Sequence, residues 1–404
     1  MKNRIAAVLA VLLALYAGFQ LGQNRTAAQT RLPEGQEVTQ TTERTFEKAE
    51  YLKAFIEQNF LYETDEEVLN EGMLRGLFSA LEDPYSVYMN EEEFTSLMED
   101  NRGSFGGIGV TVSPGADDNL ITVVAPMKDT PGDRAGIRAG DKIIRVEGEE
   151  YTGEQMDMAV KVMRGEPGTD VTITIRRLSS EKPPEEFDLT ITREIINVIS
   201  AEGEMLPDQL GYIGITSFDE NTDRYFREAL KDLEAQGARG IVIDLRNNPG
   251  GLLDTVLEIA DSLLPEGPIV ITKTRAGQEV VEESDRAMDE IPLVVLINEG
   301  SASASEILAG AIQDYERGPI IGETSFGKGI VQRILPLDDG SGIKLTVSEY
   351  YTPKERKIHE IGVEPDIPVE WEGEDPTFGP SVLEQDAQLQ RAMEALEEQI
   401  ISQE

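Results

Sequence analysis

The chain has 404 residues, of which 39% are hydrophobic, and this length accommodates about two or three domains. It contains no cysteine and one histidine, His359, which excludes disulfide frameworks, thiol catalysis, cysteine-based zinc sites and histidine-rich metal sites. The formal net charge of −41 repels nucleic acid, so we expect no nucleic-acid partner and interpret the charge as favouring solubility. The composition predicts no cofactor and no metal.

The first residues have the pattern of an export signal. Lys2 and Arg4 precede a charge-free stretch whose apolar part is Ile5–Phe19, shorter than the ~20 apolar residues of a full membrane-spanning helix. No A-x-A cleavage site follows, and Arg25 is the next charged residue. We therefore expect residues 1–25 to anchor the chain in the cytoplasmic membrane, with the rest periplasmic or otherwise extracytoplasmic. A cleaved signal followed by secretion is the alternative.

The next two segments differ in composition. Residues 26–45 are polar and rich in Thr, Gln and Glu, which predicts a linker. Residues 46–102 instead carry apolar residues at spacings of three and four, as in Phe46, Ala49 and Leu52, and this periodicity is typical of amphipathic helices. The sequence therefore predicts a helical N-terminal domain over residues 46–102.

The periodicity changes at Gly103, and residues 103–193 are predicted to form a separate domain of strands and short helices. Alternating or β-branched stretches predict strands at residues 104–110, 120–124, 142–146, 171–176 and 189–193. Helices are expected at residues 131–140 and 153–163.

Residues 194–371 alternate between apolar strands and amphipathic helices, a pattern typical of an α/β layered domain. Strands are predicted at residues 212–216, 241–245 and 293–297, and helices at residues 222–235, 252–264 and 303–315. Residues 372–404 are predicted to form an acidic connector and, from about Val382, an amphipathic helix. This last helix is suited to packing on the domain or to homo-oligomerisation.

The segment GSASASE, residues 300–306, follows an apolar strand and opens a helix. A serine at this position is exposed at the end of a sheet, beside backbone N–H groups and the positive end of a helix dipole, which suits a nucleophile. Ser303 and Glu306 also fit an S-x-x-E capping box, however. From this segment alone, capping is the better interpretation.

Lys328, in the segment FGKGIVQ, favours catalysis instead. No acidic residue lies within four positions on either side, although 77 of the 404 residues are acidic. A lysine that is partly buried away from carboxylates has a lowered pKa, and the neutral amine can take a proton from a serine hydroxyl. Gln332 follows four residues later and is predicted to orient the amine. A surface lysine in a glycine-rich turn is the alternative.

Two further interpretations involve glycines. Gly322 to Lys328 match most of a phosphate-binding loop, but Gly329 stands where a Mg²⁺-binding Ser or Thr is required, and residues 329–337 have a strand pattern. Nucleotide binding is therefore disfavoured. The segment DLRNNPGG, residues 244–251, ends a strand, and its backbone N–H groups would form an oxyanion hole with that of Ala304. A tight turn without catalytic role is equally consistent.

Taken together, DLRNNPGG, GSASASE, FGKGIVQ and GVEPD (residues 362–366) resemble the motifs of carboxyl-terminal processing proteases, peptidase family S41. The resemblance spans residues 46–369. It implies a serine endopeptidase of the cell envelope, with a crotonase-like α/β core similar to that of caseinolytic proteases. It also implies the catalytic roles. Ser303 would be the nucleophile, Lys328 its base and Gln332 the partner of the base, with oxyanion N–H groups from Gly251 and Ala304.

Residues 103–193 look like the PDZ domain that these proteases carry, inserted between the helical N-terminal domain and the core. A PDZ domain binds a peptide C-terminus by strand addition. Its carboxylate-binding loop would consist of Gly106, Gly107, Ile108 and Gly109, with Ile108 facing a hydrophobic pocket. Arg164 resembles the arginine that senses the bound tail. The implied substrates are proteins with unstructured C-termini.

A catalytically silent PDZ scaffold, tethered to the envelope, is the alternative from a different class. The joint presence of Ser303, Lys328 and Gln332 disfavours it. His359 is expected to be a surface residue and not the base.

Overall fold

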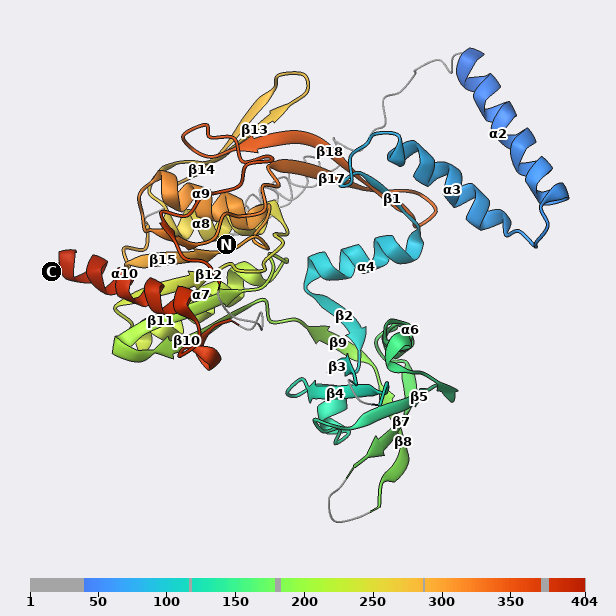
Figure 1. The fold of residues 1–404 in the computed structure, drawn as a ribbon, viewed down its shortest axis with the longest axis horizontal. Helices are drawn as coiled ribbons and strands as arrows, with labels where there is room; N and C mark the ends of the chain where they lie inside the picture. Colours follow the sequence, from blue (N-terminus) through green and yellow to red (C-terminus); the bar gives the residue numbers. More distant parts are fainter. Residues whose placement is uncertain (1–39, 116–117, 179–182, 286–287, 372–377, 404) are drawn as a thin grey trace, which may run out of the picture. The chain divides into compact units, whose positions relative to one another are not determined.

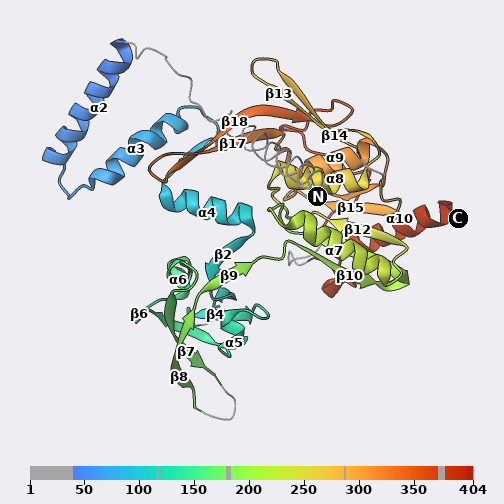
Figure 2. The ribbon, with the colours of Figure 1, turned by 180° about the vertical axis from the view of Figure 1, so that it is seen from behind.

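The computed structural model describes residues 40–115, 118–178, 183–285, 288–371 and 378–403. The apolar stretch at residues 5–19 lies outside them. Two compact units are present. One contains the described residues up to Phe94 together with Gln332–Thr346, and the other contains Thr95–Val331 and the described residues from Val347 on. Figures 1 and 2 show both, coloured along the sequence. Within the described ranges, no helix is long and apolar enough to span a membrane.

The first unit is mainly helical. It contains α2 (Gln40–Asn59), α3 (Glu66–Ser79), β1 (Val87–Met89) and the start of α4 (Glu91–Arg102). Helix α2 begins inside residues 26–45, so the prediction of a linker over that whole segment is wrong. No Gly or Pro interrupts residues 40–46, and the helix therefore continues into polar residues that carry no apolar periodicity.

The domain predicted at residues 103–193 is a small β structure. Its elements are β2 (Ser104–Gly107), β3 (Val110–Pro114), β4 (Ile121–Pro126), α5 (Pro131–Arg134), β5 (Lys142–Val146), β6 (Glu149–Glu150), α6 (Met156–Met163), β7 (Asp170–Arg177), β8 (Glu185–Thr192) and β9 (Glu194–Asn197). Strands β3, β4, β5, β7 and β8 form one antiparallel sheet, and β2 pairs with β9. Ile121, Ile143 and Ile173 are fully buried in its core. Strands β4, β5 and β7 confirm the predictions at residues 120–124, 142–146 and 171–176, whereas residues 104–110 contain the strand β2 and the start of β3 and not one strand.

The second unit also contains a mostly parallel sheet, with strand order β10-β11-β12-β15-β16-β19. The strands are β10 (Ala201–Leu206), β11 (Leu210–Ile215), β12 (Gly240–Asp244), β15 (Leu293–Ile297), β16 (Ile320–Gly322) and β19 (Ile367–Pro368). The helices are α7 (Thr222–Ala235), α8 (Leu253–Leu263), α9 (Ala304–Asp314) and α10 (Ala387–Gln403). Alternation of strands and helices in this segment is confirmed.

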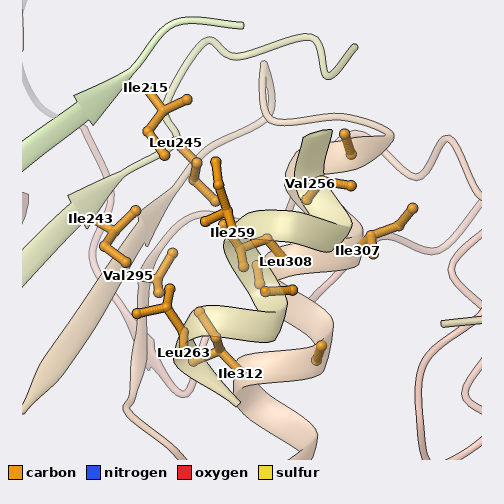
Figure 3. Packing of buried hydrophobic residues seen from close by; sticks show 14 of the residues in the cluster. Ile215, Ile243, Leu245, Val256, Ile259, Leu263, Val295, Ile307, Leu308 and Ile312 are labelled. Atoms are coloured by element: carbon orange, nitrogen blue, oxygen red, sulfur yellow. The ribbon is translucent and has the colours of Figure 1, made fainter. Parts of the chain in front are cut away.

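Helices cover both faces of this sheet. Ile243 and Val295 pack with Ile259 of α8 and Leu308 of α9, as Figure 3 shows, while Val294 on the opposite face packs against α10. Burial on both faces explains why β12 and β15 are continuous apolar runs, and this made them easy to predict.

A second sheet contains β13 (Gly267–Thr274), β14 (Glu279–Ser284), β17 (Ile330–Pro336) and β18 (Gly342–Tyr351). Strands β17 and β18 pass through both compact units, and β1 pairs with the first residues of β18. The strand pattern at residues 329–337 is thereby confirmed. Strands β13, β14 and β18 were not predicted.

Helix α10 begins at Ala387, after the predicted start near Val382. Asp386 caps it, since its carboxylate accepts the Leu389 N–H at 2.9 Å. The same carboxylate binds Arg246, which follows β12, with Nη2–Oδ2 at 2.8 Å. Arg246 also binds Asp244, with Nε–Oδ1 at 2.9 Å, and all three side chains are almost fully buried. This ion-pair network ties the end of β12 to the start of α10.

Candidate active site

The turns that follow β12 and β15 are bonded to each other. The two strands are parallel neighbours, so both turns emerge at the same edge of the sheet. The Asn247 N–H donates to Asn298 Oδ1 at 2.8 Å, and Asn298 Nδ2 donates to Asn247 Oδ1 at 2.9 Å. Ser301 Oγ donates to the Leu245 carbonyl at 2.7 Å. The DLRNNPGG and GSASASE motifs therefore form one hydrogen-bonded structure.

Ser303 has a strained backbone. It immediately precedes α9, with φ +55° and ψ −113°. These angles are those of the first central residue of a type II′ turn, where glycine dominates, and a non-glycine residue there costs about 1–3 kcal/mol. The serine nucleophiles of α/β-hydrolases lie on strained strand-to-helix turns. The strain therefore points to a functional serine and not only to a helix cap.

The carboxylate of Glu306 binds the backbones of both predicted catalytic residues. Glu306 is completely buried, and its Oε2 accepts the Ser303 N–H at 2.8 Å and the Lys328 N–H at 2.9 Å. Its Oε1 accepts the Gly327 N–H at 2.7 Å and the Ser325 hydroxyl at 2.6 Å. The bond to Ser303 is the one a capping box provides, so capping and the assembly of a site coincide here.

Gly250, which precedes the predicted oxyanion donor Gly251, lies against Ser303 and Ala304. A Cβ on Gly250 would lie 2.7 Å from the Ser303 Cβ and 2.9 Å from the Ala304 nitrogen, so this glycine allows the two turns to touch. The Gly250 N–H already donates to Asn248 Oδ1 at 2.9 Å. Among the described residues, the N–H groups of Gly251 and Ala304 have no hydrogen-bond partner. Their role as oxyanion donors stays a prediction.

Gln332 and His359 occupy different environments. Gln332 belongs to the unit that contains α2 and α3, where its side-chain nitrogen donates to the Tyr85 carbonyl. Its role in catalysis stays a prediction from its place four residues after Lys328. His359 is half-buried, and its backbone leaves no room for a Cβ on Gly329. His359 is thus partly covered and not fully exposed, because residues 358–362 pack against the glycines that flank Lys328. That it is not the base stays a prediction.

Only two residues of the predicted carboxylate-binding loop, Ile108 and Gly109, join β2 to β3, because Gly106 and Gly107 belong to β2 and pair with β9. Among the residues that the structure describes, the N–H groups of Ile108 and Gly109 have no partner. The side chain of Ile108 is only 2% exposed and packs in the domain core, so the prediction that it faces a ligand pocket is wrong. The Gly165 N–H donates to the Gly106 carbonyl at 3.1 Å, and the guanidinium of Arg164 lies 4.2 Å from the Phe105 ring centre. Arg164 is thus adjacent to the loop.

Comparison with known proteins identifies the family. A model of peptidase family S41 matches residues 209–369, and a PDZ domain model matches residues 122–177. A model of the N-terminal domain of the activating protease CtpB matches residues 8–93. The carboxy-terminal-processing protease of Bartonella bacilliformis is 41% identical over 332 residues, which cover 79% of this chain and 75% of that protein. The chain belongs to peptidase family S41.

This S41 protease has further relatives of the same kind. The carboxy-terminal processing protease CtpB of Bacillus subtilis is 35% identical over 380 residues, covering 91% of this chain and 78% of that protein. The crystal structure of a Bacteroides fragilis protein described as an S41 protease shares the fold, with a TM-score of 0.52 and 14% sequence identity. The match covers 90% of this chain and 98% of that chain. The protein is therefore a carboxyl-terminal processing serine protease, a hydrolase with a PDZ domain and protein substrates.

Sequence reasoning did not find several residues that build the site of this S41 protease. Asn247 and Asn298 bond the two turns to each other, and Glu306 was predicted only as a capping residue. The fixed spacing of Glu306 after Ser303 was the available signal. It could not reveal that the same carboxylate reaches Lys328, which is 22 positions further along the chain.

Proposed function

We propose that this protease cleaves proteins near their C-termini with a Ser303–Lys328 pair, that it acts outside the cytoplasm, and that its PDZ domain selects substrate tails. The observation that carries the proposal is the buried Glu306 carboxylate, which accepts hydrogen bonds from the backbones of strained Ser303 and of Lys328. A crotonase-like architecture for the core belongs to the same proposal. It is supported by a nucleophile turn between a central parallel strand and the start of a helix.

In the proposed reaction, neutral Lys328 takes the hydroxyl proton as Ser303 Oγ attacks the substrate carbonyl carbon. The N–H groups of Gly251 and Ala304, together with the positive end of α9, stabilise the negative charge on the carbonyl oxygen. The lysine ammonium then protonates the leaving amine, and water hydrolyses the resulting ester. By resemblance to the family motif, Gln332 is included in the proposal as the partner of this base.

Extracytoplasmic location is supported by the charge pattern at the N-terminus. Lys2 and Arg4 on the cytoplasmic side would orient the apolar stretch Ile5–Phe19 with the remainder of the chain outside. A reporter that is active only in the cytoplasm, fused after residue 39, should therefore be silent. The same fusion without residues 1–25 should be active and serves as the control. A full signal from the first fusion would contradict the proposed topology.

Recognition of a free C-terminus is tested with matched peptides that end in an acid or an amide. The open N–H groups of Ile108 and Gly109 support capture of a carboxylate. Each hydrogen bond to a charged acceptor is worth roughly 1.5–3 kcal/mol, so kcat/KM should be at least about tenfold lower for the amide than for the acid. Peptides with small or apolar C-terminal residues are expected to be cut best.

A glycine substitution provides the matched control for this experiment. Gly109→Ala should abolish the preference for the acid, because Gly109 has φ +72° and a Cβ there would overlap Thr130. Gly136→Ala introduces a side chain at a comparable φ of +81°, but into open space, and should keep the preference. Equal rates for acid and amide on the intact enzyme would refute recognition by the PDZ domain. Failure to cut any tail peptide would favour the silent scaffold.

A further inference from the structure

Tyr350 is a second residue, besides Glu306, that is bonded to both turns of the proposed catalytic pair. It lies near the end of β18, is 1% exposed and belongs to the core that also contains α8 and α9. Its N–H donates to the Gly329 carbonyl at 3.0 Å, so its backbone holds the residue that follows Lys328. The ring then extends towards the start of α9.

The Tyr350 hydroxyl lies between two backbone carbonyls. It is 2.9 Å from the carbonyl oxygen of Ser303 and 2.6 Å from that of Lys328. Both oxygens accept only, and the phenol has one proton, so it is shared between them in a three-centre hydrogen bond. A single hydroxyl therefore binds the backbones of both residues that the proposed function assigns to catalysis.

We propose that Tyr350 is a positioning residue that sets the separation between the Ser303 nucleophile and the Lys328 base, and this inference rests on the proposed function. The carboxylate of Glu306 binds the N–H groups of the two residues, and the hydroxyl of Tyr350 binds their carbonyls. Both the N–H group and the carbonyl group of each of the two residues are therefore hydrogen-bonded. These four bonds involve only backbone groups of Ser303 and Lys328.

The hydroxyl keeps its proton at any working pH of the enzyme. Burial, and then the nearby Glu306 carboxylate, raise the pKa of Tyr350 well above its ordinary value. The group therefore acts as a permanent donor to the two carbonyls and not as a general acid or base. Phenylalanine would fill the same space in the core, so a role in packing alone predicts that the hydroxyl is dispensable.

The test compares Tyr350→Phe with Tyr351→Phe in the full chain. Tyr351 is the matched control, since its hydroxyl donates to Glu349 at 2.8 Å and to neither catalytic turn. Misplacement of reacting groups by about 1 Å costs up to roughly 100-fold, so kcat of Tyr350→Phe should fall by about 10- to 100-fold with KM unchanged. The rate at which a fluorophosphonate labels Ser303, located by mass spectrometry, should fall by the same factor. Tyr351→Phe should match the wild type.

Each outcome decides the inference. Wild-type kcat and labelling in Tyr350→Phe would overturn it, as would an equal loss in Tyr351→Phe. A loss accompanied by a lower melting temperature and a raised KM would show a structural role only and would also overturn it. If Ser303 of the wild-type enzyme is not labelled, the proposed catalytic pair itself fails, and this result is distinct from the others.

Discussion

Ser303→Ala and Lys328→Ala should each lower kcat/KM on an unstructured tail peptide by about 10⁴-fold or more while the protein stays folded. The first change removes the attacking oxygen, and the second removes the group that accepts its proton. Both residues are held through their backbone N–H groups by Glu306, and alanine preserves those bonds. Peptide hydrolysis and thermal melting are the two measurements.

His359→Ala is the control for this experiment. His359 is the single histidine of the chain, and a histidine base is the usual alternative to lysine. The variant should keep near-normal turnover. Loss of activity in His359→Ala, or retention of activity in Lys328→Ala, would contradict the Ser-Lys assignment. Activity of the wild type should also rise from neutral to alkaline pH, as the Lys328 ammonium gives up its proton.

Arg246→Met should lower the free energy of unfolding by about 3–5 kcal/mol, because it leaves the buried carboxylates of Asp244 and Asp386 facing each other without a cation. Urea denaturation measures this change. Arg224→Met removes an exposed i,i+4 pair with Glu228 and should cost less than about 1 kcal/mol. A similar small cost for Arg246→Met would show that the buried network does not stabilise the fold.

The pH dependence of the stability of Arg246→Met tests the electrostatic part of this contribution. Burial alone would raise the pKa of Asp386, but the hydrogen bonds and the charge of Arg246 lower it overall. A carboxyl whose pKa is lowered by folding stabilises the protein above its unfolded pKa of about 3.9 and loses that contribution as pH falls through the folded value. The stability difference between wild type and Arg246→Met should therefore be largest near neutrality and should shrink in acid.

Elements with a local apolar period were predicted closely from the sequence. The predicted strands at residues 142–146 and 293–297 and the helix at residues 222–235 have the same bounds as β5, β15 and α7. Strand β14 was missed, because most of its residues are exposed and three of the six are glutamates. It is a strand because it pairs with β13 across a short turn, and its exposed glutamates hide the apolar alternation that would have predicted it.

The residues of the proposed site likewise differ in whether the local sequence reveals them. Motifs around Ser303 and Lys328 carry their own signal in residue type and spacing. Tyr350 carries none, since it comes to Ser303 from 47 positions away and a tyrosine in an apolar strand is ordinary. The conformation of Ser303 is equally invisible, because the sequence does not distinguish a serine at positive φ from one that simply caps a helix.

At position 303, thermal stability and catalytic activity favour different residues. Glycine adopts φ +55° without strain, so Ser303→Gly would recover about 1–3 kcal/mol, less up to about 1 kcal/mol for the greater freedom of glycine in the unfolded chain. A laboratory selection that scored only survival of heating would therefore enrich clones with glycine at this position, and by the proposed mechanism these clones would not cleave peptides. Directed evolution of a more durable enzyme has to hold Ser303 constant and score peptide cleavage in every round.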